Sequence, residues 1–456
     1  MSLEVIILAA GKGTRMRSDL PKVLHPLAGK PMLVHAVEQA QKLEPTSTHI
    51  IVGHRADQVE AVVQPLGAQC VTQDQQLGTG HAVAQAMPKV NENATVLVLY
   101  GDVPLVPAAL MQQLVDQASQ PEQDDLAILT VTLDDSTGYG RIVRNDEGYI
   151  QAIVEHKDAN TDQLQIKEIN TGILAVKASL LNGWLPRIES NNAQGEIYLT
   201  DIVAMAVANG VGICHLQPDF PQQTQGVNDR VQLAELERWY QRQNANQLLR
   251  DGVQLADPTR FDLRGELTAG KDIYIDINVI IEGQVHLADG VHIGPNCHIK
   301  DAYIGAGTQI LANSVIDQAQ AAANCNIGPF ARLRPGTVLH DNAKVGNFVE
   351  TKKTTLGKGS KANHFTYLGD TLVGENVNIG AGTITCNYDG VNKFKTTIAD
   401  GAFIGSNSSI VAPVTIGAGA TIGAGSTITK DVADNSLAIA RGKQRNLATW
   451  AKPVKI

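Results

Sequence analysis

Aliphatic residues return every six positions through residues 273–432, and a glycine often follows them, as at Ile293-Gly294, Ile404-Gly405 and Ile422-Gly423. A second small or branched residue stands four places after many of these pairs. Neither the helical period of about 3.6 nor the strand period of about 2 accounts for this spacing. It predicts short strands and turns whose first and fifth side chains point inward, with three units completing one triangular coil of a parallel β-helix.

Single coils cannot bury their apolar face alone, so the stack has to be long, and its flat outer faces suit packing against copies of itself. The pattern resembles the left-handed β-helix of hexapeptide-repeat acyltransferases. Two segments depart from the six-residue rule. We expect residues 362–367 to interrupt the coil, and residues 385–395 to form a polar insertion. Insertions in repeat proteins often carry function.

Earlier in the chain, two continuous apolar runs are typical of buried parallel strands. Val5–Ala10 leads into Gly11–Met16, and Thr95–Tyr100 leads into Gly101-Asp102. A dinucleotide fingerprint needs Gly where Met16 stands, and a P-loop needs GK followed by Ser or Thr, so both are excluded. The pattern predicts an α/β Rossmann-like domain with a glycine-rich loop that binds a different phosphate ligand.

Between these regions, residues 229–250 lack Gly and Pro and carry an approximately helical apolar stripe. We therefore expect three parts: an α/β domain over residues 1–228, a linker helix over 229–250, and the β-helix over 251–456.

Composition restricts the class of protein. The chain has 456 residues, 43% of them hydrophobic, and a net charge of −9, which argues against a general nucleic-acid or membrane binder. Its five cysteines are odd in number and lack CxxC spacing, as expected for free thiols in a reducing compartment. The apolar run near the amino terminus is too short for a membrane span or a signal-peptide core. We expect a cytoplasmic protein.

The run from Leu8 to Arg15, followed by Pro21-Lys22, resembles the GxGTR…PK signature of sugar-1-phosphate nucleotidyltransferases. The resemblance implies that Arg15 and Lys22 act in catalysis by neutralising phosphate charge, and that Gln73 and the backbone of Gly78 select the uracil of UTP. It assigns the binding of UTP or a UDP-sugar to Leu8, Ala9, Ala10, Gly11, Lys22, Gln73, Gly78, Thr79, Tyr100, Gly101, Asp102, Gly140, Glu155, Asn170 and Asn228.

Asp102 follows a predicted buried strand, where ligands bind in open α/β sheets. On its own it could equally be a capping residue. The family resemblance pairs it with Asn228 as ligands of Mg²⁺, which prefers carboxylate and amide oxygens together with water and substrate phosphates.

Three histidines, His286, His292 and His298, raise the alternative of a zinc site. Residues six apart fall on successive faces of a triangular coil, so these side chains should diverge. We expect them to be exposed and not to bind a metal.

A second resemblance comes from His364, the 385–395 insertion, and the segments 332–336 and 347–353. Together they are similar to the acetyltransferase site of the bifunctional N-acetylglucosamine-1-phosphate uridyltransferase / glucosamine-1-phosphate N-acetyltransferase family. By that resemblance His364 is the general base, since a neutral amine must attack the thioester. The sugar-phosphate residues are Arg334, Lys352, Tyr367 and Asn378, and the acetyl-CoA residues are Ala381, Asn387, Tyr388, Ser406, Ala424 and Arg441.

The resemblance then covers nearly the whole chain and implies two reactions that together make UDP-N-acetylglucosamine, a cell-wall precursor. The resemblance implies that acetyl-CoA and UTP are substrates and that Mg²⁺ is the cofactor. It also implies a homotrimer of this chain, with the acetyltransferase sites between neighbouring chains. The alternative is a nucleotidyltransferase whose β-helix only regulates or oligomerises; a scaffold of that kind has no need of His364 or the insertion. A purely structural protein is disfavoured by residues 8–22.

Overall fold

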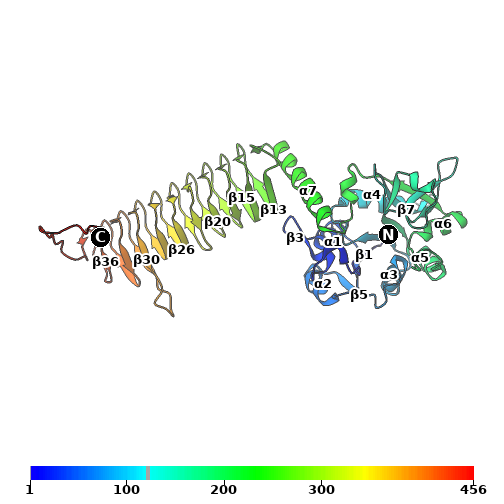
Figure 1. The fold of residues 1–456 in the computed structure, drawn as a ribbon, viewed down its shortest axis with the longest axis horizontal. Helices are drawn as coiled ribbons and strands as arrows, with labels where there is room; N and C mark the ends of the chain where they lie inside the picture. The colour runs from blue at the N-terminus through cyan, green and yellow to red at the C-terminus, as the bar shows by residue number, and fades with distance from the viewer. Residues whose placement is uncertain (1, 120–123, 456) are drawn as a thin grey trace. The chain divides into compact units, whose positions relative to one another are not determined.

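The computed structural model describes residues 2–119 and 124–455. Two compact units make up the chain, Met1–Trp239 and Tyr240–Ile456 (Figure 1). The boundary between them falls inside helix α7 (Arg230–Arg250), which confirms the predicted helix to within one residue at its start. Among the described residues, none of the helices combines the length and the apolar character that crossing a membrane requires.

A mixed sheet forms the first unit, with strand order β11-β7-β10-β6-β1-β4-β5. Strand β1 pairs in parallel with β4 and β6, and β5 pairs in parallel with β4. Strand β10 runs antiparallel to β6 and β7, and β8 and β9 form a hairpin beside it. The bounds are β1 (Leu3–Leu8), β4 (Ser47–Val52), β5 (Gln69–Thr72), β6 (Thr95–Tyr100), β7 (Asp124–Thr132), β8 (Arg141–Arg144), β9 (Ile150–Val154), β10 (Glu168–Lys177) and β11 (Gly212–Leu216).

Both faces of this sheet are buried, which explains the continuous apolar runs. Ile6 and Val98 pack in one core layer, whereas Ile7 and Leu97 pack in the other. The second predicted strand is β6, as expected, but the first ends at Leu8, two residues early. The helices are α1 (Met32–Gln41), α2 (Ala56–Val63), α3 (Thr79–Ala86), α4 (Ala108–Ala118), α5 (Ala178–Trp184) and α6 (Asp201–Ala208), and a short ribbon joins β2 (Pro26–Leu27) to β3 (Lys30–Pro31).

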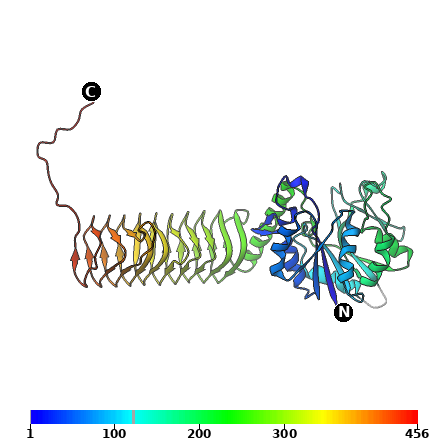
Figure 2. The same cartoon turned by 90° about the horizontal axis from the view of Figure 1, so that it is seen from below.

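The second unit is a left-handed parallel β-helix, as predicted, and its stacked coils are visible in Figure 2. Eleven short strands form one face: β12 (Gln254–Leu255), β14 (Tyr274–Ile275), β16 (His292–Ile293), β19 (Gln309–Ile310), β22 (Asn326–Ile327), β25 (Lys344–Asn347), β27 (Lys361–His364), β29 (Asn378–Ile379), β32 (Phe403–Ile404), β35 (Thr421–Ile422) and β37 (Leu437–Ala438).

The remaining strands form the other two faces, which are joined because the longest of them continue from one face to the next. They are β13 (Phe261–Ala269), β15 (Val279–Leu287), β17 (His298–Lys300), β18 (Tyr303–Ile304), β20 (Val315–Asp317), β21 (Gln320–Ala321), β23 (Arg332–Leu333), β24 (Val338–Leu339), β26 (Glu350–Leu356), β28 (Tyr367–Val373), β30 (Ile384–Cys386), β31 (Thr396–Ile398), β33 (Ser409–Val411), β34 (Val414–Ile416) and β36 (Thr427–Ile428).

Burial confirms the six-residue rule, since the first and fifth positions of each unit, such as Ile293 and Cys297, are inside. One prediction is wrong. Residues 362–367 do not interrupt the coil, because Ala362 pairs with Val345 and Ile379 and is fully buried. A small side chain therefore occupies an ordinary inward position. The 385–395 insertion is confirmed, since the chain leaves the ladder after Cys386 and returns at Thr396.

Candidate active sites

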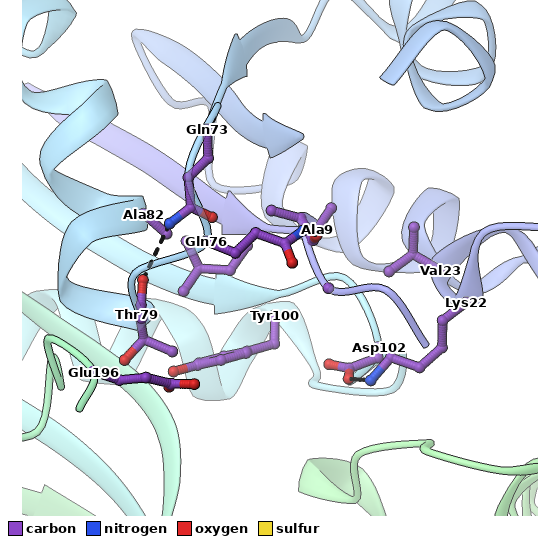
Figure 3. Close-up of a pocket in the computed structure, with 14 residues that line it drawn as sticks. Ala9, Lys22, Val23, Gln73, Gln76, Thr79, Ala82, Tyr100, Asp102 and Glu196 are labelled. Atoms are coloured by element: carbon purple, nitrogen blue, oxygen red, sulfur yellow. Dashed lines mark hydrogen bonds and ion pairs between the residues drawn. The ribbon is translucent and has the colours of Figure 1, made fainter. Parts of the chain in front are cut away.

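The first candidate site lies where β1 and β6 end at the carboxyl edge of the sheet, which is where ligands bind in open α/β sheets. A pocket of about 230 Å³ opens there (Figure 3). Ten of the residues predicted to bind nucleotide line it: Leu8, Ala9, Ala10, Gly11, Lys22, Gln73, Gly78, Thr79, Tyr100 and Asp102. Gly101 lies in the adjoining turn and donates its N–H to the Leu8 carbonyl at 2.9 Å.

Four polar side chains converge at one end of this pocket. Lys22 Nζ forms an ion pair with Asp102 and lies 3.2 Å from Asn228 Oδ1, which also accepts from Arg15 Nη2 at 2.8 Å. The residue at position 13 is glycine because a Cβ there would lie 2.5 Å from that of Lys22. A carboxylate and an amide oxygen thus already share one cationic group, the Lys22 ammonium. This donor set fits Mg²⁺, which takes few protein oxygens and completes its shell with water and phosphate.

At the other end, Gln73 is almost fully buried and its Nε2 lies 3.2 Å from the carbonyl oxygen of Gly78. Gly78 has φ +119° and packs directly on the backbone of Ile197. The two residues predicted to select uracil are therefore in contact with each other.

The predicted sugar residues lie beside the pocket and not in its wall. Asn170 donates its N–H to the Gly140 carbonyl at 2.9 Å, and a Cβ on Gly140 would lie 3.4 Å from the Glu155 carboxylate. Burial raises the pKa of Glu155, and the hydroxyl of Thr200, 3.2 Å away, partly opposes that shift. Burial first, and then the charges of Glu155 and Asp102, raise the pKa of Tyr100.

Four lining residues were not assigned from the sequence: Val23, Gln76, Ala82 and Glu196. Gln76 donates to the Ala10 carbonyl at 2.6 Å and so joins the base-side loop to the phosphate loop. Gln76 lies three residues after Gln73, and Val23 directly follows Lys22. The nearness of both residues to the ligand could therefore have been found from their position in the sequence, although their contacts could not.

The second candidate site lies on one corner of the β-helix. His364 is exposed, and its Nδ1 lies 2.8 Å from Asn347 Oδ1, its partner on the preceding coil. A pocket of about 260 Å³ adjoins them, lined by Asn326, Gly328, Pro329, Lys344, Val345, Gly346 and Asn363. The amide oxygen can only accept, so Nδ1 carries a proton, and in the neutral imidazole the lone pair is therefore on Nε2.

Strand register places His364 in one row with three residues predicted to bind acetyl-CoA. Ala362, Ile379, Ile404 and Ile422 pair in sequence, so the residue two positions after each falls at the same corner. The residues in that row are His364, Ala381, Ser406 and Ala424. Arg441 Nη1 donates to the Ala424 carbonyl at 2.7 Å and extends it. The other two, Asn387 and Tyr388, lie in the insertion, where Asn387 Nδ2 contacts Asp370 at 2.5 Å.

The predicted sugar-phosphate residues do not all meet within a single chain. Arg334 and Lys352 occupy neighbouring coils of one face, with Tyr367 on the next coil. Contact with Lys393, and then the charge of Arg334, lowers the pKa of Lys352, as expected where cations gather to bind an anion. Asn378, however, belongs to β29 on a different face.

The three histidines of the early coils diverge, as predicted. His286 stacks on Tyr303, His292 stacks on Tyr274, and His298 Nε2 lies 3.0 Å from Glu282. All three are half-buried and not exposed as expected, because tyrosine rings stack on two of them and the Glu282 side chain contacts the third. Within residues 2–119 and 124–455 no group of three or more His, Cys, Asp or Glu side chains could hold a metal ion.

Comparisons with known proteins match both halves of the chain. The family model of the MobA-like NTP transferase domain matches residues 5–159, and that of the bacterial transferase hexapeptide matches residues 395–430. The chain is 58% identical to the "Bifunctional protein GlmU" of Marinobacter nauticus and 59% identical to that of Cellvibrio japonicus, in each case over 99% of both chains. Among solved structures, a nucleotidyl transferase from Methanothermobacter thermautotroptrophicus has 20% identity and a TM-score of 0.39, covering 53% of this chain and 99% of that one.

Proposed function

The chain belongs to the family of bifunctional GlmU proteins, and from that premise we propose how its uridyltransferase and acetyltransferase domains divide the synthesis of UDP-N-acetylglucosamine. The β-helix transfers an acetyl group from acetyl-CoA to glucosamine-1-phosphate. The first unit then transfers UMP from UTP to the acetylated sugar phosphate and releases pyrophosphate. The observation that carries this proposal is the full-length similarity, together with a group of polar side chains in each unit: the pocket that Lys22 and Asp102 line in the first, and the His364–Asn347 pair in the second.

In the first unit, the phosphate oxygen of N-acetylglucosamine-1-phosphate attacks the α-phosphorus of UTP, and pyrophosphate leaves from the opposite side. Arg15 and Lys22 are placed to neutralise the charge that moves between the phosphates. Asp102 and Asn228 would hold Mg²⁺, which lowers the charge on the phosphate oxygens when bound. Lys22 then turns from Asp102 toward the triphosphate.

In the β-helix, Nε2 of His364 takes a proton from the amine of glucosamine-1-phosphate as the nitrogen attacks the thioester carbonyl. The carbon–sulfur bond breaks, and coenzyme A leaves as the thiolate. Asn347 accepts from the Nδ1–H, so in the neutral imidazole Nε2 has the lone pair that takes this proton. Coils in a parallel stack are about 4.8 Å apart, so the row from His364 to Ala424 provides roughly 14 Å for the extended arm of acetyl-CoA.

The β-helix is proposed to assemble as a homotrimer in the cytoplasm, with its acetyltransferase sites between chains. Two observations support this assembly. His364 and the neighbouring side chain of Phe365 are exposed on a single chain. Asn378 lies on a different face from Arg334 and Lys352, so a neighbouring copy would have to bring its own Asn378 to complete the sugar-phosphate site.

One assay separates the two functions. Purified protein receives acetyl-CoA with glucosamine-1-phosphate, or UTP with N-acetylglucosamine-1-phosphate and Mg²⁺, and free thiol and pyrophosphate are measured in each. We expect thiol in the first mixture and pyrophosphate in the second. Pyrophosphate without any thiol would mean that the β-helix only assembles the enzyme, which is the alternative raised by its scaffold-like faces.

A further inference from the structure

The orientation of the buried Gln73 amide decides what the base end of the first pocket can accept. Gln73 is only 4% exposed, and its Nε2 lies 3.2 Å from the Gly78 carbonyl oxygen and 3.0 Å from His81 Nδ1. A carbonyl oxygen can only accept, so the –NH₂ group must point at these two atoms. Among the described residues, none donates to Oε1, and Figure 3 shows this oxygen on the side facing Gln76.

The imidazole of His81 then has one compatible state. Because Gln73 donates to Nδ1, the ring must be neutral with its proton on Nε2. Gln85 Nε2 lies 3.2 Å from Nε2 of His81 and also donates to the His81 backbone carbonyl at 3.2 Å. Because Gln85 is only half-buried, water can take over the bond to that carbonyl when the amide turns its oxygen toward the proton on Nε2. The buried amide of Gln73 has no such freedom.

We propose that His81 is a positioning residue that selects uracil by fixing the Gln73 amide with its oxygen toward the base. This inference rests on the proposed uridyltransferase function of the pocket. The N3–H of uracil can donate to a fixed amide oxygen. Cytosine carries a lone pair at N3 and would meet that oxygen with repulsion. A Gln73 amide that turned over would instead offer –NH₂ to cytosine and lose its contact with His81.

The test compares two variants of similar shape. In His81→Asn, Oδ1 occupies the same branch of the side chain as the imidazole Nδ1 and can still accept, whereas His81→Leu fills the space without an acceptor. Asn182→Ala is the control, since Asn182 shares with His81 the wall of a neighbouring cavity of about 560 Å³. The readout is the ratio of kcat/KM for UTP to that for CTP, measured by pyrophosphate release in the full-length enzyme.

We expect His81→Leu to lower the UTP/CTP ratio about tenfold, the effect of one hydrogen bond within a buried site, while His81→Asn and Asn182→Ala keep it within about twofold. A structural role of His81 would lower both rates equally and leave the ratio unchanged, which would overturn the proposal. A UTP/CTP ratio that falls in His81→Asn as much as in His81→Leu would also contradict the proposal. If the unmodified enzyme released no pyrophosphate from UTP, the failure would lie with the proposed function and not with His81.

Discussion

Gly78 offers a severe test of the geometry at the base end of the nucleotide pocket. Its φ of +119° lies in a region that other residues rarely adopt, and a Cβ there would lie 2.5 Å from the carbonyl oxygen of Ile197 and 2.7 Å from its nitrogen. Both contacts are to backbone, which cannot rotate away. The same backbone holds the loop, since Gly80 donates to the Ile197 carbonyl at 2.8 Å and Ile197 donates to the Leu77 carbonyl at 2.7 Å.

Gly78→Ala should therefore displace the loop that carries the pocket wall. Backbone strain of this kind costs about 1–3 kcal/mol, which corresponds to a loss of roughly 5- to 150-fold. We expect kcat/KM for UTP to fall by that factor in the pyrophosphate assay, while acetyl transfer by the β-helix stays unchanged.

Gly67→Ala is the matched control, because Gly67 also has positive φ, at +74°, but a Cβ there would meet nothing within 4 Å. It should cost stability of about 1 kcal/mol without a specific loss of UTP use. Equal losses in both variants, or a Gly78→Ala enzyme within twofold of the original, would refute the reasoning from the Ile197 contact.

Three further predictions follow from other parts of the molecule. Asn347→Leu should lower the acetyl-transfer kcat at least tenfold with little change in KM. Asn347→Asp should retain more activity, because its carboxylate still accepts from His364. Equal rates in the two variants would exclude a role of Asn347 in fixing the imidazole. EDTA should stop pyrophosphate release and leave thiol release intact, and chelation without effect would exclude the metal role of Asp102. Burial raises the pKa of Cys297 and Cys325 to about 11, so at pH 8 both remain thiols, and native labelling followed by mass spectrometry should find them unmodified while Cys386 reacts.

Much of the fold could be predicted because its signals are local. The six-residue period follows directly from which side chains are buried, so the coils of the β-helix could be predicted from sequence alone. The position of Asp102 could be predicted as well, because it follows the end of β6 by two residues. The mistake at residues 362–367 arose because Ala362 is a weak hydrophobic signal, although it is as buried as the isoleucines in the same row.

The geometry of the sites depended on the folded chain. Lys22 and Asn228 are 206 positions apart, and no sequence period connects them. The row through His364 is hidden in the sequence because coil lengths differ: Ile327 pairs with Val345, Val345 with Ala362, and Ile379 with Ile404 across the insertion. Only the strand register reveals that Asn347 lies beside His364, or that Asn378 lies on another face.

The two chemistries reside in two separate units of one chain. The most direct measurement assays Asp102→Ala and His364→Ala for both thiol release and pyrophosphate release, with thermal unfolding to show that each variant is folded. We predict that Asp102→Ala abolishes pyrophosphate release but keeps acetyl transfer, and that His364→Ala does the reverse. Loss of both activities in either folded variant would contradict the account.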